Sequence, residues 1–228
     1  MSVYRNTAFK WILLFVTVGI VSFCLYYVLR TVFVIRTIEI AGQGITVVVD
    51  EKKIPKNLLF FPSEKIRSDI LSGNQLLSDV VFRKKYPSTL VIQPVLRNPF
   101  LIIQTPELSG LVDTKGYVLE YGDQAKKLPV LHFSNMRIQK GEQLKNEKAL
   151  FAIRVVESIN AIEPVVSVQE KEGPGIEVVT EKMRILFSQE VDMAKAIATL
   201  QTLIAGFRIK GTLPSVVDLR FDKPVVHF

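Results

Sequence analysis

The chain carries few side chains of the kinds that perform acid–base, nucleophilic or metal chemistry. Its two histidines, His132 and His227, lie far apart in the sequence and have no neighbouring ligand pattern. A metal site or a histidine-based triad would need the fold alone to bring them together. The nominal serine–lysine pairs are Ser63 with Lys65 and Ser88 with Lys85. Because closeness in sequence does not establish hydrogen-bond reach, we expect no enzyme, cofactor, metal or small-molecule substrate, and keep a membrane-anchored serine–lysine hydrolase as the alternative.

An uncharged run near the start indicates how the chain is held in place. The 19 residues Trp11 to Leu29 are bounded by Lys10 and Arg30. As a helix they would span roughly 28 Å, the thickness of a bilayer core. Small residues and interfacial aromatics complete the pattern, and the expected membrane-span markers are Trp11, Gly19, Tyr26, Tyr27 and Leu29. The run is longer than the apolar region of a signal peptide, and it ends in bulky residues rather than in a small-residue cleavage site. We therefore expect a retained single-pass anchor.

The orientation of that anchor is set only weakly by charge. Arg5 and Lys10 precede the span, and Arg30 and Arg36 follow it, so the distribution of positive charge does not decide the direction. The free α-amino group favours a cytoplasmic tail of residues 1–10. We therefore expect residues 11–29 in the cytoplasmic membrane and the remaining chain on its outer face.

The composition of the exported part indicates folded domains rather than a charged polymer binder. The chain is 48% hydrophobic and 22% charged, which is typical of globular proteins. Its net charge of +7 is partly located at the ends of the span, and the mildly basic remainder predicts no nucleic-acid binding. The single cysteine, Cys24, lies within the span. The exported part therefore has no thiol nucleophile and no disulfide, and must be held by core packing.

The first exported segment reads as a small α/β domain, residues 32–97. Alternating apolar residues predict two strands around the turn at Gly42 to Gly44, the second running from Ile45 to Asp50. A helix capped by Ser63 and ending at Gly73 follows. The runs Val80 to Tyr86 and Thr89 to Leu96 then predict a hairpin around Pro87–Ser88.

The second exported segment, residues 98–228, reads as a larger mixed β domain with two helices. Asn146 and Asp192 are the predicted caps of these helices, and Pro164 follows the first. The expected strands are 100–103, 111–113, 117–121, 130–133, 165–169, 176–180, 183–187, 216–221 and 225–228. The fold class is thus α+β: one transmembrane helix, a small domain and a larger mixed sheet.

Several segments together give the chain a family resemblance. They are VIRTIEIAG at 34–42, LLSDVVFRKKYPSTLVI at 76–92, LVDTKGYVLE at 111–120, LPVL at 128–131 and VDLRF at 217–221. Because these segments occur in this order beyond a single anchor, the chain resembles the FtsQ/DivIB family of bacterial cell-division proteins. The resemblance implies a POTRA domain beside the membrane, a β domain beyond it, enrichment at the division septum, and a non-enzymatic scaffold that binds FtsB-like and FtsL-like proteins.

The chain also departs from that family. The first POTRA strand of the family is followed by two helices, whereas only residues 63–72 read as a helix here. A POTRA-type accessory of protein translocation is a further alternative, although such proteins normally carry several POTRA domains or a barrel.

The end of the chain is the expected partner site. Val217, Leu219 and Phe221 share one face of the predicted strand 216–221, and no element follows the last strand to cover it. An uncovered strand offers backbone groups to an incoming strand. The resemblance implies that FtsB is captured on this segment, so the expected partner-binding residues are Arg220, Phe221, Lys223, Val225, Val226 and Phe228. Membrane lipid is a separate expected partner, at the anchor. Pro224 lacks a donor, so the pairing register must skip it, and the simpler role of Val217 and Leu219 is in the core.

Overall fold

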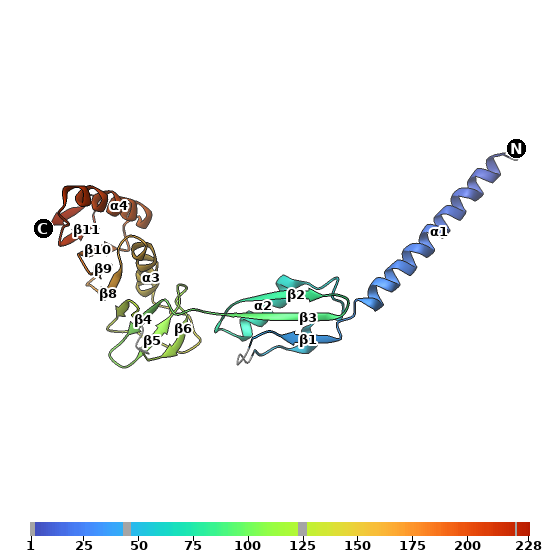
Figure 1. Ribbon diagram of the computed structural model, residues 1–228, viewed down its shortest axis with the longest axis horizontal. Helices are drawn as coiled ribbons and strands as arrows, with labels where there is room; N and C mark the ends of the chain where they lie inside the picture. Colours follow the sequence, from blue (N-terminus) through green and yellow to red (C-terminus); the bar gives the residue numbers. More distant parts are fainter. Residues whose placement is uncertain (1–2, 43–46, 123–126, 222) are drawn as a thin grey trace. The chain divides into compact units, whose positions relative to one another are not determined.

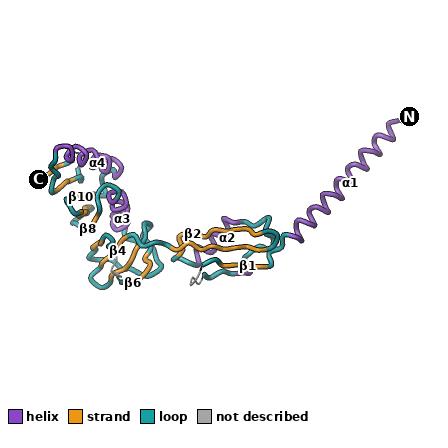
Figure 2. The backbone as a smooth tube through the Cα atoms, viewed as in Figure 1, coloured by secondary structure: helices purple, strands orange, loops and turns teal. Residues whose placement is uncertain are grey.

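The computed structural model describes residues 3–42, 47–122, 127–221 and 223–228. The chain divides into two compact units, Met1–Leu96 and Arg97–Phe228. Figure 1 shows their elements, and Figure 2 distinguishes helix from strand. The fold is α+β, with one apolar helix at the N-terminus and a large mixed sheet, as the sequence predicted.

Helix α1 is long and apolar enough to cross a membrane. It runs from Val3 to Val32, and its apolar part, Phe9–Val32, has a mean hydropathy of 2.5 and no buried residue. A soluble core helix would bury one face, whereas this helix buries none, as expected for a segment that could span a membrane. The predicted markers Trp11, Tyr26 and Tyr27 are all more than half exposed on this helix.

The first unit contains a three-stranded sheet with one α-helix packed on it. Its elements are β1 (Thr37–Ile40), a 3₁₀ turn (Glu51–Lys53), α2 (Ser63–Gly73), β2 (Leu77–Lys85) and β3 (Thr89–Leu96). The strand order is β1-β3-β2, with β1 parallel and β2 antiparallel to β3. The predicted hairpin around Pro87 is confirmed. Its core contains Leu58, Phe61, Ile66, Ile70, Leu77, Val80, Leu90 and Ile92.

The predicted strand Ile45–Asp50 is wrong in its described part, residues 47–50, while residues 43–46 lie outside the described residues. The apolar alternation is real, since Val47 and Val49 pack on the core and Val48 is 70% exposed. No strand pairs with this segment among the described residues. The Asn74 side chain instead bonds both backbone groups of Val48, at 2.9 Å each. An amide side chain thus takes the place of a ladder partner.

The second unit is built on one nine-stranded mixed sheet. Its strands are β4 (Leu101–Gln104), β5 (Ser109–Val112), β6 (Val118–Tyr121), β7 (Val130–His132), β8 (Val165–Glu170), β9 (Gly175–Thr180), β10 (Arg184–Ser188), β11 (Val216–Asp218) and β12 (Val225–His227). Their order is β12-β11-β10-β9-β8-β7-β4-β5-β6. The two edge strands of this sheet are β6 and β12.

Two helices cover the core of this sheet, α3 (Glu147–Asn160) and α4 (Met193–Lys210). The predicted caps of these two helices are confirmed: Asn146 accepts from the Ala149 N–H, and Asp192 accepts from the N–H groups of Ala194 and Lys195. The predicted cap Ser63 is wrong, because Ser63 is the first residue of α2 and Pro62, which makes no side-chain cap bond, precedes it. Helix α3 packs against β8 and α4 (Figure 1). The buried faces of both helices join the core with the strands.

Buried charges fix the helices at one point. Glu163, 3% exposed in its side chain, follows α3 and bonds Lys182 at 2.8 Å and Arg208 of α4 at 2.9 Å. The hydrogen bond from Lys182 is the main reason why the pKa of Glu163 is lowered, with a smaller contribution from Arg208. This clamp joins α3, α4 and the β9–β10 turn.

A candidate partner-binding edge of the large sheet

One end of the nine-stranded sheet is covered by the chain itself. Strand β6 pairs with β5 on one side. On its other side, Val118 donates to the Glu142 oxygen at 2.9 Å and accepts from the Gly141 N–H at 2.7 Å. The Leu144 N–H also bonds the Gly116 oxygen at 2.9 Å. Residues 141–144 therefore form an edge cover at the start of β6, where they satisfy both outward backbone groups of Val118.

The other end of the sheet is open in the part of the chain that the structure describes. Strand β12 pairs antiparallel with β11, Val217 facing Val226, and no described strand lies on its other side. The backbone direction follows from two bonds of β11: Arg184 N–H to Ser215 oxygen and Leu219 N–H to Leu186 oxygen, both 2.9 Å. The Ser215 carbonyl and the Leu219 N–H, which flank β11, thus point toward β10.

The outward backbone groups of β12 belong to alternate residues. Ser215 donates to the His227 oxygen at 2.7 Å, so His227 points its carbonyl toward β11. Because backbone groups alternate along a strand, Val226 points its N–H and C=O to the open side. Pro224 falls on the same side and has no N–H. An incoming strand would therefore find both a donor and an acceptor at Val226, but only an acceptor at Pro224.

The side chains of β12 divide between core and surface. Val226 is partly buried and packs on the core. Val225 is 45% exposed, and Phe228 is 71% exposed with its ring edge-to-face on Phe207 of α4, 5.4 Å between centroids. The two exposed apolar residues flank the open edge. At Val226, the backbone groups rather than the side chain are therefore available on the open side.

The predicted strand 216–221 is too long, because the backbone bends after Asp218. The Asp218 carboxylate accepts from the Arg220 backbone N–H at 3.0 Å, and the Arg220 guanidinium bonds both of its oxygens. Burial alone would raise the pKa of Asp218, but these bonds from Arg220 lower it. Arg220 is thus held by Asp218, which sequence reasoning did not identify as a site residue. The acid two positions before the arginine is the signal that could have revealed it.

The bend changes where Phe221 lies. Val217 and Leu219 are buried in the core as expected, whereas Phe221 is 61% exposed, with the Arg220 guanidinium 5.6 Å from its ring centroid. A hollow of about 20 Å³ lies between this bend and α4, room for about one water. Its lining includes Lys195, Thr199, Phe221 and Pro224. Lys223 is exposed just before the edge strand.

The remaining membrane-span residues show how α1 continues into the first unit. Gly19 has no neighbour within 4 Å of the position of an added Cβ. The Leu29 carbonyl accepts from the Asn57 side chain at 3.2 Å. The C-terminal end of the apolar helix is thus bonded directly to a loop of the first unit.

The nominal catalytic residues are not brought together. His132 on β7 and His227 on β12 lie five strand spacings apart in the sheet order, about 24 Å. Lys85 is 63% exposed and pairs with Glu39 at 2.7 Å, so it is not a desolvated base for Ser88. Ser63 and Lys65 are two positions apart in the first turn of α2, a spacing that does not place side chains face to face.

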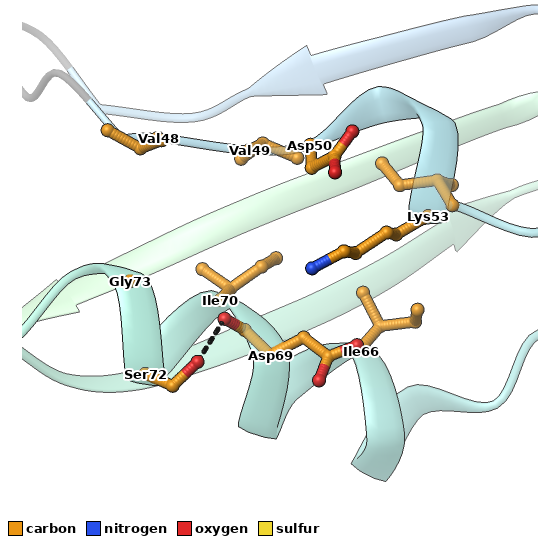
Figure 3. A pocket seen from close by; sticks show the side chains of 10 residues that line it. Val48, Val49, Asp50, Lys53, Ile66, Asp69, Ile70, Ser72 and Gly73 are labelled. Carbon is orange, nitrogen blue, oxygen red and sulfur yellow. Dashed lines mark hydrogen bonds between the residues drawn. The ribbon is translucent and has the colours of Figure 1, made fainter.

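The first unit also has a hollow that the sequence did not predict. It has a volume of about 200 Å³ and lies between the 48–54 segment and α2. Ile66 and Ile70 form its floor, and Figure 3 shows the Lys53 side chain lying in it near Asp50 and Asp69. The hollow exists because the 47–50 segment is extended but unpaired.

Comparisons with known proteins add no identification. No family model matches the chain, and no significant match is found among curated proteins.

Proposed function

We propose that the protein is a non-enzymatic scaffold of the bacterial division machinery, similar to FtsQ/DivIB. In this proposal it captures an extended segment of an FtsB-like or FtsL-like partner on the open side of β12. The observation that supports it is the difference between the sheet ends: residues 141–144 cover β6, while no described segment covers β12. Uncovered edges are normally protected because they pair readily with other chains.

The proposed mechanism is addition of a strand to the sheet. The partner would bond Val226 through its backbone and place alternate side chains beside Val225 and the exposed rings of Phe221 and Phe228. The Asp218 carboxylate holds Arg220 at the same edge. With α1 as the anchor, capture raises the effective concentration of the other division proteins in the plane of the membrane.

The rest of the proposal concerns location and the small domain. We place the N-terminus in the cytoplasm, both units on the outer face, and the protein at the septum. We also propose that the first unit is a POTRA-like domain that has lost one helix. The single α-helix, α2, on a sheet in which β1 runs parallel to β3 supports this.

The sharpest test removes one outward N–H without removing a bond to β11. In Val226→Pro, the ring replaces the donor on the open side, where an edge strand tolerates proline. Val226→Ala is the matched control, because it shortens the same side chain and keeps the N–H. Co-purification of the full chain with co-expressed FtsB-like and FtsL-like proteins should fall roughly 10- to 100-fold for Val226→Pro, as expected for an unpaired buried group. Equal capture by both variants would overturn the proposal.

A second test uses charge at the edge. Val225→Asp places a carboxylate on the edge strand, and Val166→Asp places one on an interior strand at a similarly exposed valine, 49% against 45%. We expect only Val225→Asp to abolish capture, since only that position adjoins an incoming strand. Capture that survives Val225→Asp would locate the site elsewhere, and loss of capture in both variants, with folding retained, would show a general effect of the added charge.

A further inference from the structure

A loop of the first unit is bonded to the end of the apolar helix. The Asn57 amide donates to the carbonyls of Leu29 and Arg30, at 3.2 and 3.4 Å. The Leu58 N–H donates to the Phe33 oxygen at 2.7 Å, and the Ile35 N–H to the Lys56 oxygen at 2.8 Å. These bonds hold residues 56–58 beside the C-terminal end of α1.

The β2–β3 turn lies at the same end of the unit. The Arg36 N–H donates to the Ser88 oxygen at 2.9 Å. The Phe33 and Tyr86 rings meet edge-to-face, with centroids 5.6 Å apart. Two segments that are distant in sequence therefore meet where the chain leaves the helix.

These segments expose a set of basic and aromatic side chains, here named the basic–aromatic cluster. Its members are Arg36, Lys56, Phe60, Arg83 and Tyr86. Phe60 is 63% and Tyr86 57% exposed. Among the described residues, the three cations make no ion pair or side-chain hydrogen bond.

The other charges at this end leave it positive. Lys85 is neutralised by Glu39, and Lys84 donates to the Leu59 oxygen while lying over the Phe61 ring. Glu64 is an exposed acid at the start of α2, and its partner is Arg67 at 3.5 Å. The cations of the cluster are thus not balanced by nearby acids.

The length of the connection keeps the cluster near the bilayer. Only residues 33–36 separate α1 from β1. Four residues reach at most about 14 Å, and the headgroup layer beyond the hydrocarbon is about 7 Å deep. With α1 in the membrane, the cluster lies within reach of the lipid headgroups.

We propose that the basic–aromatic cluster is a docking surface for a bilayer that contains anionic phospholipid. Arg36, Lys56 and Arg83 bind headgroup phosphates, and the Phe60 and Tyr86 rings enter the interface. Arginine and lysine beside exposed aromatic rings are the combination that interfacial anchoring uses. This surface is separate from the β12 edge and adds a second, lipid-dependent constraint to the first unit.

The test places a reporter within the cluster of the full chain. Trp11 is the only tryptophan, so Trp11→Phe with Phe60→Trp leaves a single tryptophan at the proposed interface. The chain is placed in nanodiscs of brominated phosphatidylcholine, alone or with phosphatidylglycerol. Bromine quenches tryptophan only at short range. We expect the quenching with phosphatidylglycerol to be at least about twice that in phosphatidylcholine alone. We expect this increase to be lost in 0.5 M salt, which screens the charges.

Matched charge variants decide the cause. Arg36→Gln, Lys56→Gln and Arg83→Gln together should reduce quenching to the level in pure phosphatidylcholine. Each basic residue contributes about fivefold to the ratio of docked to undocked protein, so removing three should lower this ratio roughly 100-fold. The control removes the same charges from the second unit, through Arg137→Gln, Lys145→Gln and Arg154→Gln, and should leave quenching unchanged.

Three results would overturn the proposal. Quenching that does not depend on phosphatidylglycerol would show that anionic lipid is not recognised. An unaltered signal in the cluster variant would show that its cations do not bind headgroups. An equal loss in the control would show a general effect of net charge. The salt titration of the chain with an intact cluster gives an answer even if the triple variant does not fold.

Discussion

The two ends of the nine-stranded sheet solve the same problem differently. At β6, residues Gly141 to Leu144 lie beside the start of the strand and bond both outward backbone groups of Val118. At β12, Val226 faces outward and no described strand lies beside it. Among the described residues, the two edges therefore differ in whether their outward backbone groups have partners. Lys223 and Pro224, residue types that guard edges against indiscriminate pairing, directly precede β12.

The support behind the two edges also differs. The β12 end depends on α4, which the Glu163 clamp fixes to α3 and the β9–β10 turn. The β6 end depends on turns that require glycine. Perturbing each support separately tests whether the two ends behave independently.

The largest expected effect comes from Glu163→Gln, which removes the charge shared by Lys182 and Arg208. We expect unfolding to become easier by about 2.5 kcal/mol, less than for a fully buried pair because both cations are half exposed. Hydrogen exchange should increase in α4, β11 and β12 more than in β4 to β6. Uniform loosening of the sheet would show that the clamp does not favour the open end.

The covered end is perturbed by Gly116→Ala. Gly116 has a φ of +83°, and an added Cβ would lie 2.5 Å from Leu150 Cδ2. We expect a loss of about 2 kcal/mol, part from backbone strain and part from this clash. Gly122→Ala is the control at φ +97° with no neighbour within 4 Å, and should cost about 1 kcal/mol. Chemical denaturation measures both losses, and equal losses would contradict the clash.

The bend at the open edge is tested by pH. The Asp218 pKa lies below its ordinary 3.8, so its charged form stabilises the fold above that pH, and the stabilisation is lost as the pH falls through the lowered native value. Asp218→Asn should cost about 1 kcal/mol at pH 7. The difference between the two proteins should shrink toward zero below pH 3.8. A difference that persists in acid would assign the effect to packing rather than to the ion pair.

The smallest effect is expected at the last residue. Phe228→Ala removes the ring contact with Phe207. Because Phe228 is 71% exposed, we expect the free energy of unfolding to fall by only about 0.5 kcal/mol. Partner capture should fall by a larger factor than the folding equilibrium constant does, since the Phe228 ring flanks the open side of β12. Thermal unfolding and co-purification of the same variant give the two values. Unchanged capture would remove Phe228 from the proposed site.

Local signals in the sequence predicted the local elements well. Asn146 and Asp192 were recognisable as caps because each uses its own side chain on N–H groups two or three residues away. Pro87 and Ser88 marked the β2–β3 turn, and the charge-free run marked α1. These features depend on residues close together in the chain.

The features that sequence reasoning missed depend on distant residues. The strand predicted at 47–50 failed because Asn74, far along the chain, bonds Val48. The cover on β6 is an irregular backbone contact with no hydrophobic period to reveal it. The apolar residues near the end of the sequence predicted a last strand, but the outward direction of Val226 depends on its register with β11. Periodicity identifies which residues are buried, not what their backbone groups meet.

The bond from Asn57 to the last carbonyls of α1 has a mechanical consequence. A long flexible linker would extend under force before the force reached the apolar helix. Because four connecting residues and the Asn57 amide join α1 to the first unit, we expect a pull on that unit to be transmitted to α1 with little extension.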